Sequence, residues 1–280
     1  MKIIIVGCGK VGYALAEELN EEKHDITVID TNSDKLDRVL SDLDVQGIVG
    51  NGTSYRVQME AGIKDSDLLI AVTGKDEINL LCCLIAKKAG NCNTIARVRN
   101  PEYFDEIKYL REELGLAMAI NPELACAQSI ARLIEVPSAL DITSFVKGRA
   151  DLIKLPVPQG SIVDNMPVYE FATKVHTNTL ICAIERAHDV IIPDGNTVLH
   201  VGDKMYVIIP PAEIHFLLQK IGIKAKRIRS VMIIGGSMIA YYLAKHLESA
   251  HLQVKIIEQN FEQCEKLSDS LPHVMIINGD

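Results

Sequence analysis

Apolar runs and amphipathic stretches alternate along the first half of the chain. Short apolar runs, typical of strands buried on both faces of a parallel sheet, occupy residues 2–6, 26–30, 46–49, 67–72, 94–98 and 116–120. Stretches with helical spacing of apolar residues fill the intervals at 10–22, 31–43, 76–89 and 121–136. Gly90 is expected just past the end of the third helix. This alternation predicts an α/β fold with a Rossmann-like, doubly wound parallel sheet.

The pattern changes after Pro137. Prolines separate short apolar runs that are predicted as strands at 151–157, 179–186, 190–193 and 204–210. Two short amphipathic stretches, at 166–174 and 212–222, are predicted as helices. The composition of 138–222 therefore predicts a small α+β lobe. A basic stretch at 223–230 is expected to be a connector.

The first pattern resumes at residue 231 with an offset of 228 positions. Ile5, Tyr13, Leu15, Ala16, Leu19, Ile29 and Asn32 recur as Ile233, Tyr241, Leu243, Ala244, Leu247, Ile257 and Asn260. A repeat of this length indicates a duplicated unit. The second copy reaches only its third strand, at 274–277, which leaves a sheet edge and an apolar face uncovered. We expect three domains, at 1–137, 138–222 and 223–280, the last being the shortened start of a second Rossmann lobe.

Composition narrows the class of protein. The 280 residues are 48% hydrophobic and 24% charged, which suits folded domains. No apolar run approaches the ~20 residues of a membrane helix, and no signal peptide is recognisable, so a cytoplasmic location is expected. The net charge of −8 argues against a nucleic-acid partner. Seven scattered cysteines show no metal-ligand spacing and are expected to be reduced.

The segment "GCGKVG" joins the first strand to the first helix. Gly7 suits a tight turn, Gly9 lets the backbone approach a pyrophosphate, and Gly12 lets helix and strand pack closely. The free N–H groups at Lys10 and Val11 supply an anion site at the helix start. Asp30 ends the second strand, where a carboxylate accepts hydrogen bonds from ribose hydroxyls and repels a 2′-phosphate. These residues predict a dinucleotide site that prefers NAD to NADP.

Polar residues at the ends of the other strands point to the same site. Asn51 and Gly52 follow the third strand, Thr73 and Gly74 follow the fourth, and Arg97 lies near the end of the fifth. Ligands of such sheets bind beyond the carboxyl ends of the strands, so these residues are expected to line one crevice. The arginine can pair with a phosphate through a bidentate fork.

No catalytic residue is expected. None of the eight histidines lies in a strand-end loop of the first lobe, where a nicotinamide would sit. Asp76 and Glu77 begin a helix, and the helix macrodipole alone explains carboxylates there. Two alternatives stay open: a soluble NAD-dependent dehydrogenase, and a redox sensor in which the Cys8 thiol has a pKa lowered by the helix start.

The runs "AVTGKDEINLL" and "IARVRNPEY", together with the glycine turn, carry a more specific signal. With them the chain closely resembles the TrkA family, the regulatory subunits of Trk potassium-uptake systems built from RCK (also KTN) domains. The resemblance covers the whole chain as an RCK N-lobe, an RCK_C (TrkA_C) lobe and a second N-lobe.

The resemblance implies a regulator and not an enzyme. It implies that the Rossmann lobe binds NAD(H) and, in some members, ATP or ADP. The resemblance and the residue pattern together assign the nucleotide site to Gly7, Cys8, Gly9, Lys10, Val11, Gly12, Asp30, Asn51, Gly52, Thr73, Gly74 and Arg97.

The partners are implied in the same way. They are an integral-membrane potassium transporter subunit (TrkH/TrkG-like) and further copies of the chain, which pair through the helix at 121–136 and assemble towards a ring. Such a subunit lies in the cytoplasm against the inner face of the membrane. The second copy, "GGSMIA", lacks two of the three glycines, so nucleotide binding is expected at the first copy only.

Overall fold

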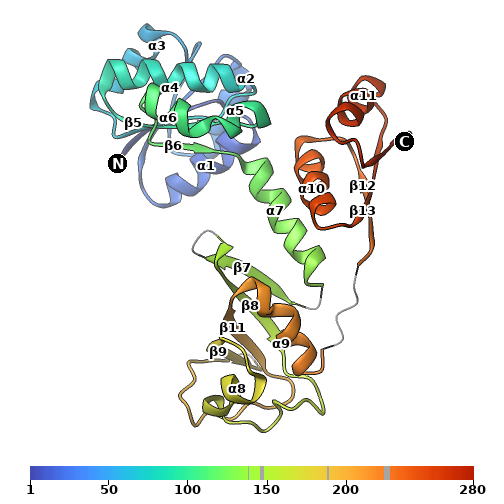
Figure 1. Ribbon diagram of the computed structural model, residues 1–280. Helices are drawn as coiled ribbons and strands as arrows, with labels where there is room; N and C mark the ends of the chain where they lie inside the picture. Colours follow the sequence, from blue (N-terminus) through green and yellow to red (C-terminus); the bar gives the residue numbers. More distant parts are fainter. Residues whose placement is uncertain (138, 146–147, 188, 224–227) are drawn as a thin grey trace. The chain divides into compact units, whose positions relative to one another are not determined.

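The computed structural model describes residues 1–280 apart from 138, 146–147, 188 and 224–227 (Figure 1). The chain divides into two compact units, Met1–Ala125 and Cys126–Asp280. Among the described residues, no helix combines the length and the apolar character that crossing a bilayer requires.

Unit 1 is built on a six-stranded parallel sheet. Its strands are β1 (Lys2–Val6), β2 (Asp25–Asp30), β3 (Gln46–Val49), β4 (Leu68–Ala71), β5 (Asn93–Arg97) and β6 (Met118–Ile120). They lie in the order β3-β2-β1-β4-β5-β6, so the direction of winding reverses between β1 and β4. This is the doubly wound Rossmann arrangement that the sequence predicts.

Helices cover both faces of this sheet (Figure 1). They are α1 (Lys10–Glu21), α2 (Ser33–Asp42), α3 (Tyr55–Glu60), α4 (Asp76–Gly90), α5 (Pro101–Asp105) and α6 (Ile107–Leu114), with a short 3₁₀ turn, η1, at Ile63–Asp65. Because successive strand residues point to opposite faces, β1 serves two cores. Ile3 and Ile5 pack in the cluster that includes α1 and α2, whereas Ile4 and Val6 pack in the cluster that includes α4.

The end of α4 differs from the prediction. The helix runs through Gly90, and Asn91 takes the left-handed conformation at the C-cap, with φ of 54°. Gly90 is needed for packing, since a Cβ there would lie 2.1 Å from the Ile63 carbonyl oxygen. The short helices α3, α5 and α6 were not predicted, because each is too short to show a helical apolar period.

Unit 2 opens with the rest of α7 (Pro122–Glu135), which begins in unit 1. A five-stranded antiparallel sheet follows, in the order β10-β9-β11-β8-β7. Its strands are β7 (Asp141–Phe145), β8 (Ala150–Pro156), β9 (Leu180–Arg186), β10 (Asp189–Ile191) and β11 (Lys204–Ile209). Its helices are α8 (Val168–Val175) and α9 (Ile214–Lys220), with the 3₁₀ turn η3 at Pro211–Glu213. This is the predicted α+β lobe with one additional strand, β7.

The rest of unit 2 repeats the first half of unit 1. Its elements are β12 (Ser230–Ile234), α10 (Met238–Ser249), β13 (Gln253–Glu258), α11 (Phe261–Ser270) and β14 (Met275–Asn278). The parallel order β12-β13-β14 matches β1-β2-β3. Asp30 pairs with Val49 and Glu258 with Asn278, so the third strand has shifted by one residue relative to the 228-residue offset. Residues 224–227, half of the predicted basic connector at 223–230, lie outside the described residues, and the domain boundaries stay a prediction.

Candidate functional site

The carboxyl ends of the unit 1 strands surround a crevice of about 360 Å³. It lies where the strand order reverses, as expected for ligand sites of open α/β sheets. Eight of the predicted site residues line it: Gly7, Gly9, Asp30, Asn51, Gly52, Thr73, Gly74 and Arg97. The described residues that line the crevice do not include the other four predicted ones, Cys8, Lys10, Val11 and Gly12.

The three glycines of the turn have three different environments. Gly7 has φ of 107°, in the left-handed region, and its N–H donates to the Ile29 carbonyl oxygen at 2.8 Å. A Cβ at Gly12 would lie 1.8 Å from the Gly7 carbonyl oxygen, which explains the close packing of α1 on β1. A Cβ at Gly9 would meet no described atom within 4 Å. Gly9 therefore faces open space in the crevice.

The start of α1 provides backbone donors. Gly9 is the N-cap residue, and no side chain caps the helix there. The N–H groups of Lys10 and Val11 have no partner within the helix, because the first turn of any α-helix leaves its donors unpaired. These donors and the helix dipole favour an anion at this point. The prediction for Lys10 and Val11 therefore concerns their backbone N–H groups and stays a prediction.

Asp30 ties the turn to the end of β2. One carboxylate oxygen accepts the backbone N–H of Cys8 at 2.6 Å, and the other accepts that of Asn32 at 2.9 Å. Each oxygen retains a lone pair for a ligand hydroxyl. The residue predicted to hold a ribose therefore also holds the shape of the glycine turn.

The Cys8 thiol is not suited to redox sensing. The side chain is buried, and burial raises its pKa to about 12, with the Asp30 carboxylate adding to the rise. The thiolate is the reactive form of cysteine. The expectation of a lowered pKa is therefore wrong, because desolvation outweighs the field of the helix start.

Asn79 organises the crevice and was not predicted. It is fully buried on α4, and its Oδ1 accepts both the N–H and the hydroxyl of Thr73, each at 2.7 Å. Its Nδ2 donates to the carbonyl oxygen of Arg97 at 2.9 Å. One amide thus fixes the ends of β4 and β5 relative to each other.

Asp76 has a structural role beyond the helix dipole. It is buried, and one carboxylate oxygen accepts the backbone N–H groups of Arg99 and Asn100, both at 2.7 Å. The carboxylate fixes the turn that follows β5. The macrodipole interpretation was incomplete, because it considered only the helix to which Asp76 belongs.

Arg97 lines the crevice and forms an ion pair with Glu123 on the first turn of α7. Both side chains are about 85% buried, with 14% and 15% exposed. Among the described residues, no partner is found for Arg97 Nε or for the second carboxylate oxygen of Glu123. Arg97, which is predicted to bind a phosphate, therefore already has a carboxylate partner, and this partner was not predicted from the sequence.

Other residues that line the crevice were not predicted from the sequence, among them Thr31, Lys35, Gly50 and Ile78. Lys35 lies on the first turn of α2, which follows Asp30 directly. Its position shortly after the end of β2 could have predicted that it lies near the crevice. It adds a cation to the crevice beside Asp30.

The second copy keeps a carboxylate that accepts two backbone N–H groups, here called the carboxylate latch, but its helix start differs from that of the first copy. Glu258 accepts the N–H groups of Gly236 at 2.6 Å and Asn260 at 2.7 Å, as Asp30 does in the first copy. At the position of Gly9, Ser237 caps α10 by accepting the Ala240 N–H at 3.4 Å. The chain itself thus supplies an acceptor at this helix start.

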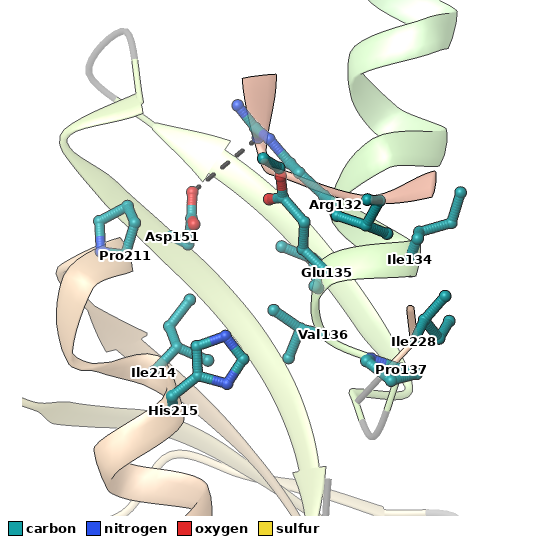
Figure 2. A pocket seen from close by; sticks show the side chains of 13 residues that line it. Arg132, Ile134, Glu135, Val136, Pro137, Asp151, Pro211, Ile214, His215 and Ile228 are labelled. Atoms are coloured by element: carbon teal, nitrogen blue, oxygen red, sulfur yellow. Dashed lines mark ion pairs between the residues drawn. The ribbon is translucent and has the colours of Figure 1, made fainter. Parts of the chain in front are cut away.

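Unit 2 has a separate recess (Figure 2). In it Arg132 of α7 and Asp151 of β8 form an ion pair at 3.9 Å, beside His215 and Ile214 of α9. Acidic and basic groups occur there together, so the recess favours no ionic ligand. Among the described residues, no cluster of three or more potential metal ligands is found.

The chain matches the model of the TrkA-N domain at residues 3–122 and 231–280, and that of the TrkA-C domain at 152–222. It is 39% identical to a Trk system potassium uptake protein TrkA homolog of Archaeoglobus fulgidus and 36% identical to a Trk system potassium uptake protein TrkA of Halomonas elongata. Both matches cover 100% of this chain, and they cover 63% and 62% of the relatives. The chain thus spans less than two thirds of these relatives.

A solved structure described as the GsuK channel bound to NAD shares the fold. Its TM-score is 0.66 at 16% sequence identity, over 100% of this chain and 53% of that one. The glycine turn, the strand order and the similarity along the whole of this chain therefore agree, and the chain belongs to the TrkA-N domain family.

Proposed function

We propose that the chain is part of a nucleotide-binding regulatory subunit of a potassium-uptake system. In this proposal the crevice of unit 1 binds NAD(H), or ATP or ADP, and the bound nucleotide alters how the chain acts on an integral-membrane transporter subunit of the TrkH/TrkG kind. The names of the full-length relatives support the transport context. The GsuK structure bound to NAD supports this choice of nucleotide in the same fold.

The observation that carries the proposal is the open helix start at Gly9. The backbone donors of α1, the free space at Gly9 and the Asp30 carboxylate lie at one end of the sheet. A pyrophosphate at the donors and a ribose at the carboxylate would use all three features. The same carboxylate would repel a 2′-phosphate, so NAD is favoured over NADP.

The twelve predicted residues divide into two roles in this proposal. The backbone of Gly7 through Gly12 would bind phosphates, and the residues at the ends of the other strands would contact ribose, base and outer phosphates. Lys35 joins the second group. The crevice then recognises the adenine nucleotide part that NAD(H), ATP and ADP share.

Regulation would pass through copies of the chain. We infer that α7 pairs with its counterpart in a second copy and that such pairs assemble towards a ring at the cytoplasmic face of the membrane. Nucleotide would act by binding one state of the assembly more tightly than another. Binding, not turnover, is then the function.

Reconstitution tests the proposal. The protein should co-purify with its transporter subunit, and potassium flux into vesicles should change on adding NADH or ATP. A Gly9→Val variant should co-purify equally well and lose the nucleotide response. Steady oxidation or reduction of the nicotinamide in the presence of small hydroxy acids would instead favour a dehydrogenase.

A further inference from the structure

The ion pair of Arg97 and Glu123 lies at the edge of the crevice for a topological reason. β5 and β6 are adjacent and parallel, with Arg97 in register with Ile120 at their carboxyl ends. α7 begins at Pro122, so its first turn stands beside the end of β5. Arg97 is therefore within reach of both a ligand in the crevice and the start of α7.

The pair is incompletely hydrogen-bonded. Arg97 donates from Nη2 to one oxygen of Glu123. Among the described atoms, Arg97 Nε and the second oxygen of Glu123 have no partner, although both are buried. A guanidinium binds carboxylate or phosphate best through two parallel hydrogen bonds. A phosphate at this place can therefore offer Arg97 a better arrangement than Glu123 does.

We propose that Glu123 competes with the nucleotide phosphate for Arg97 and so sets the nucleotide affinity of the crevice. This inference rests on the proposed function. Binding requires the guanidinium to exchange its carboxylate partner for a phosphate, so the apparent affinity is reduced by the stability of the ion pair. Glu123 lies on the helix that leads from unit 1 into unit 2, so the exchange ties nucleotide binding to the first turn of α7.

Released Glu123 does not lose all stabilisation. It lies in the first turn of α7, where the helix dipole favours a negative charge. Asn121 caps this turn independently, since its Oδ1 accepts the Leu124 N–H at 2.9 Å. The helix start therefore stays folded after the exchange but loses the ion pair that braces its first turn, and the competition is reversible.

The test is a double-mutant cycle read by calorimetry with NADH and ATP. Glu123→Gln removes the competing charge, and the dissociation constant of each nucleotide should fall about tenfold. Arg97→Gln should weaken both at least tenfold, and adding Glu123→Gln to it should give no gain. Glu77→Gln removes a carboxylate from an exposed position on α4; it controls for net charge and should leave affinity within about twofold.

Adenosine provides a ligand-side control. It has no phosphate, so its affinity should not respond to Glu123→Gln. Unchanged or weaker NADH and ATP binding in Glu123→Gln would overturn the competition and leave the proposed function intact. A gain that persists without Arg97 would also overturn it. Absence of NADH and ATP binding in the wild-type chain would overturn both.

A measurement on the wild-type chain covers the case in which Glu123→Gln fails to fold. Hydrogen exchange should show the Ala125 amide, which donates to the Asn121 carbonyl oxygen at 3.1 Å, exchanging faster when NADH is bound. The amides of the glycine turn should become protected. Slower or unchanged exchange at Ala125, with the turn protected, would overturn the inference.

Discussion

At the residue scale, Gly9 and Gly12 show how one motif combines two requirements. Gly12 is required by the fold, since any Cβ would collide with the Gly7 carbonyl oxygen. Gly9 has an extended backbone conformation, with φ of −72°, that other residues adopt freely. Its lack of a side chain keeps space open in the crevice.

Gly9→Val and Gly12→Ala should therefore differ in stability. Gly9→Val should lower the free energy of unfolding by about 1 kcal/mol, from a poorer N-cap. Gly12→Ala should lower it by about 3 kcal/mol, because helix and strand must move apart. Urea unfolding of unit 1 measures both. Equal losses would contradict the assignment of different roles to these glycines.

Asp30→Ala should affect both stability and binding. The carboxylate holds two backbone N–H groups, each a charge-assisted hydrogen bond worth about 1.5–3 kcal/mol. NADH should weaken more than ATP, because the register of its second ribose depends on the first one being anchored. Thermal unfolding and calorimetry check this. A variant of unchanged stability, or equal losses for the two nucleotides, would count against it.

Site residues within one strand–turn–helix unit were predictable from the sequence, whereas residues that connect different strand ends were not. Gly7, Gly9, Gly12 and Asp30 follow from spacing along one strand–turn–helix unit. The roles of Asn79 and Glu123 depend on which strand ends become neighbours in the folded sheet, and the spacing of residues along the sequence does not show this. Cys8 was misread because its burial depends on packing of the whole lobe.

At the element scale, the open face of the unit 2 sheet holds a charge ladder across β8, β9 and β11. Glu185 accepts from Lys154 at 2.7 Å and from Lys204 at 2.6 Å. These hydrogen bonds lower the pKa of Glu185 to about 2. Elements of this size were largely predictable from apolar periodicity. β7 was not, because its two apolar residues, Ile142 and Phe145, are three positions apart and therefore face opposite sides of the strand.

The ladder predicts a pH dependence. A lowered pKa in the folded state means that the contribution of Glu185 is complete above its ordinary value of 4.5 and is lost as the pH falls from 4.5 towards 2. Glu185→Gln should thus lower the melting temperature of unit 2 at pH 7 and change it little at pH 2. Calorimetric scans of both proteins check this, and a difference that grows on acidification would refute it.

The helix α7 predicts an association. Its apolar stripe contains Leu124, Ala127, Ile130, Ala131 and Ile134. Ile130→Glu would place an unpaired charge in the proposed isologous contact and should dissociate the proposed dimer while the chain stays folded. Light scattering measures the oligomeric state of this variant, and circular dichroism shows whether it is folded. An unchanged dimer would refute the contact, and an unfolded chain would make Ile130 an ordinary core residue.

At the scale of the whole chain, the first strand–turn–helix unit of a Rossmann fold occurs twice, and the two copies differ at the helix start. Both copies keep the left-handed glycine, Gly7 and Gly235, and the carboxylate latch at Asp30 and Glu258. Ser237 caps the second helix, whereas Gly9 leaves the first helix start free of a side-chain cap. We therefore predict one nucleotide site per chain, in unit 1.

Calorimetric titration of NADH into the 280-residue chain tests this claim most directly, with Gly9→Val and its counterpart Ser237→Val as the matched pair. We predict one site per chain, lost in Gly9→Val and unchanged in Ser237→Val, with both variants folded. Absence of binding, two equal sites, or a loss caused by Ser237→Val alone would contradict the account.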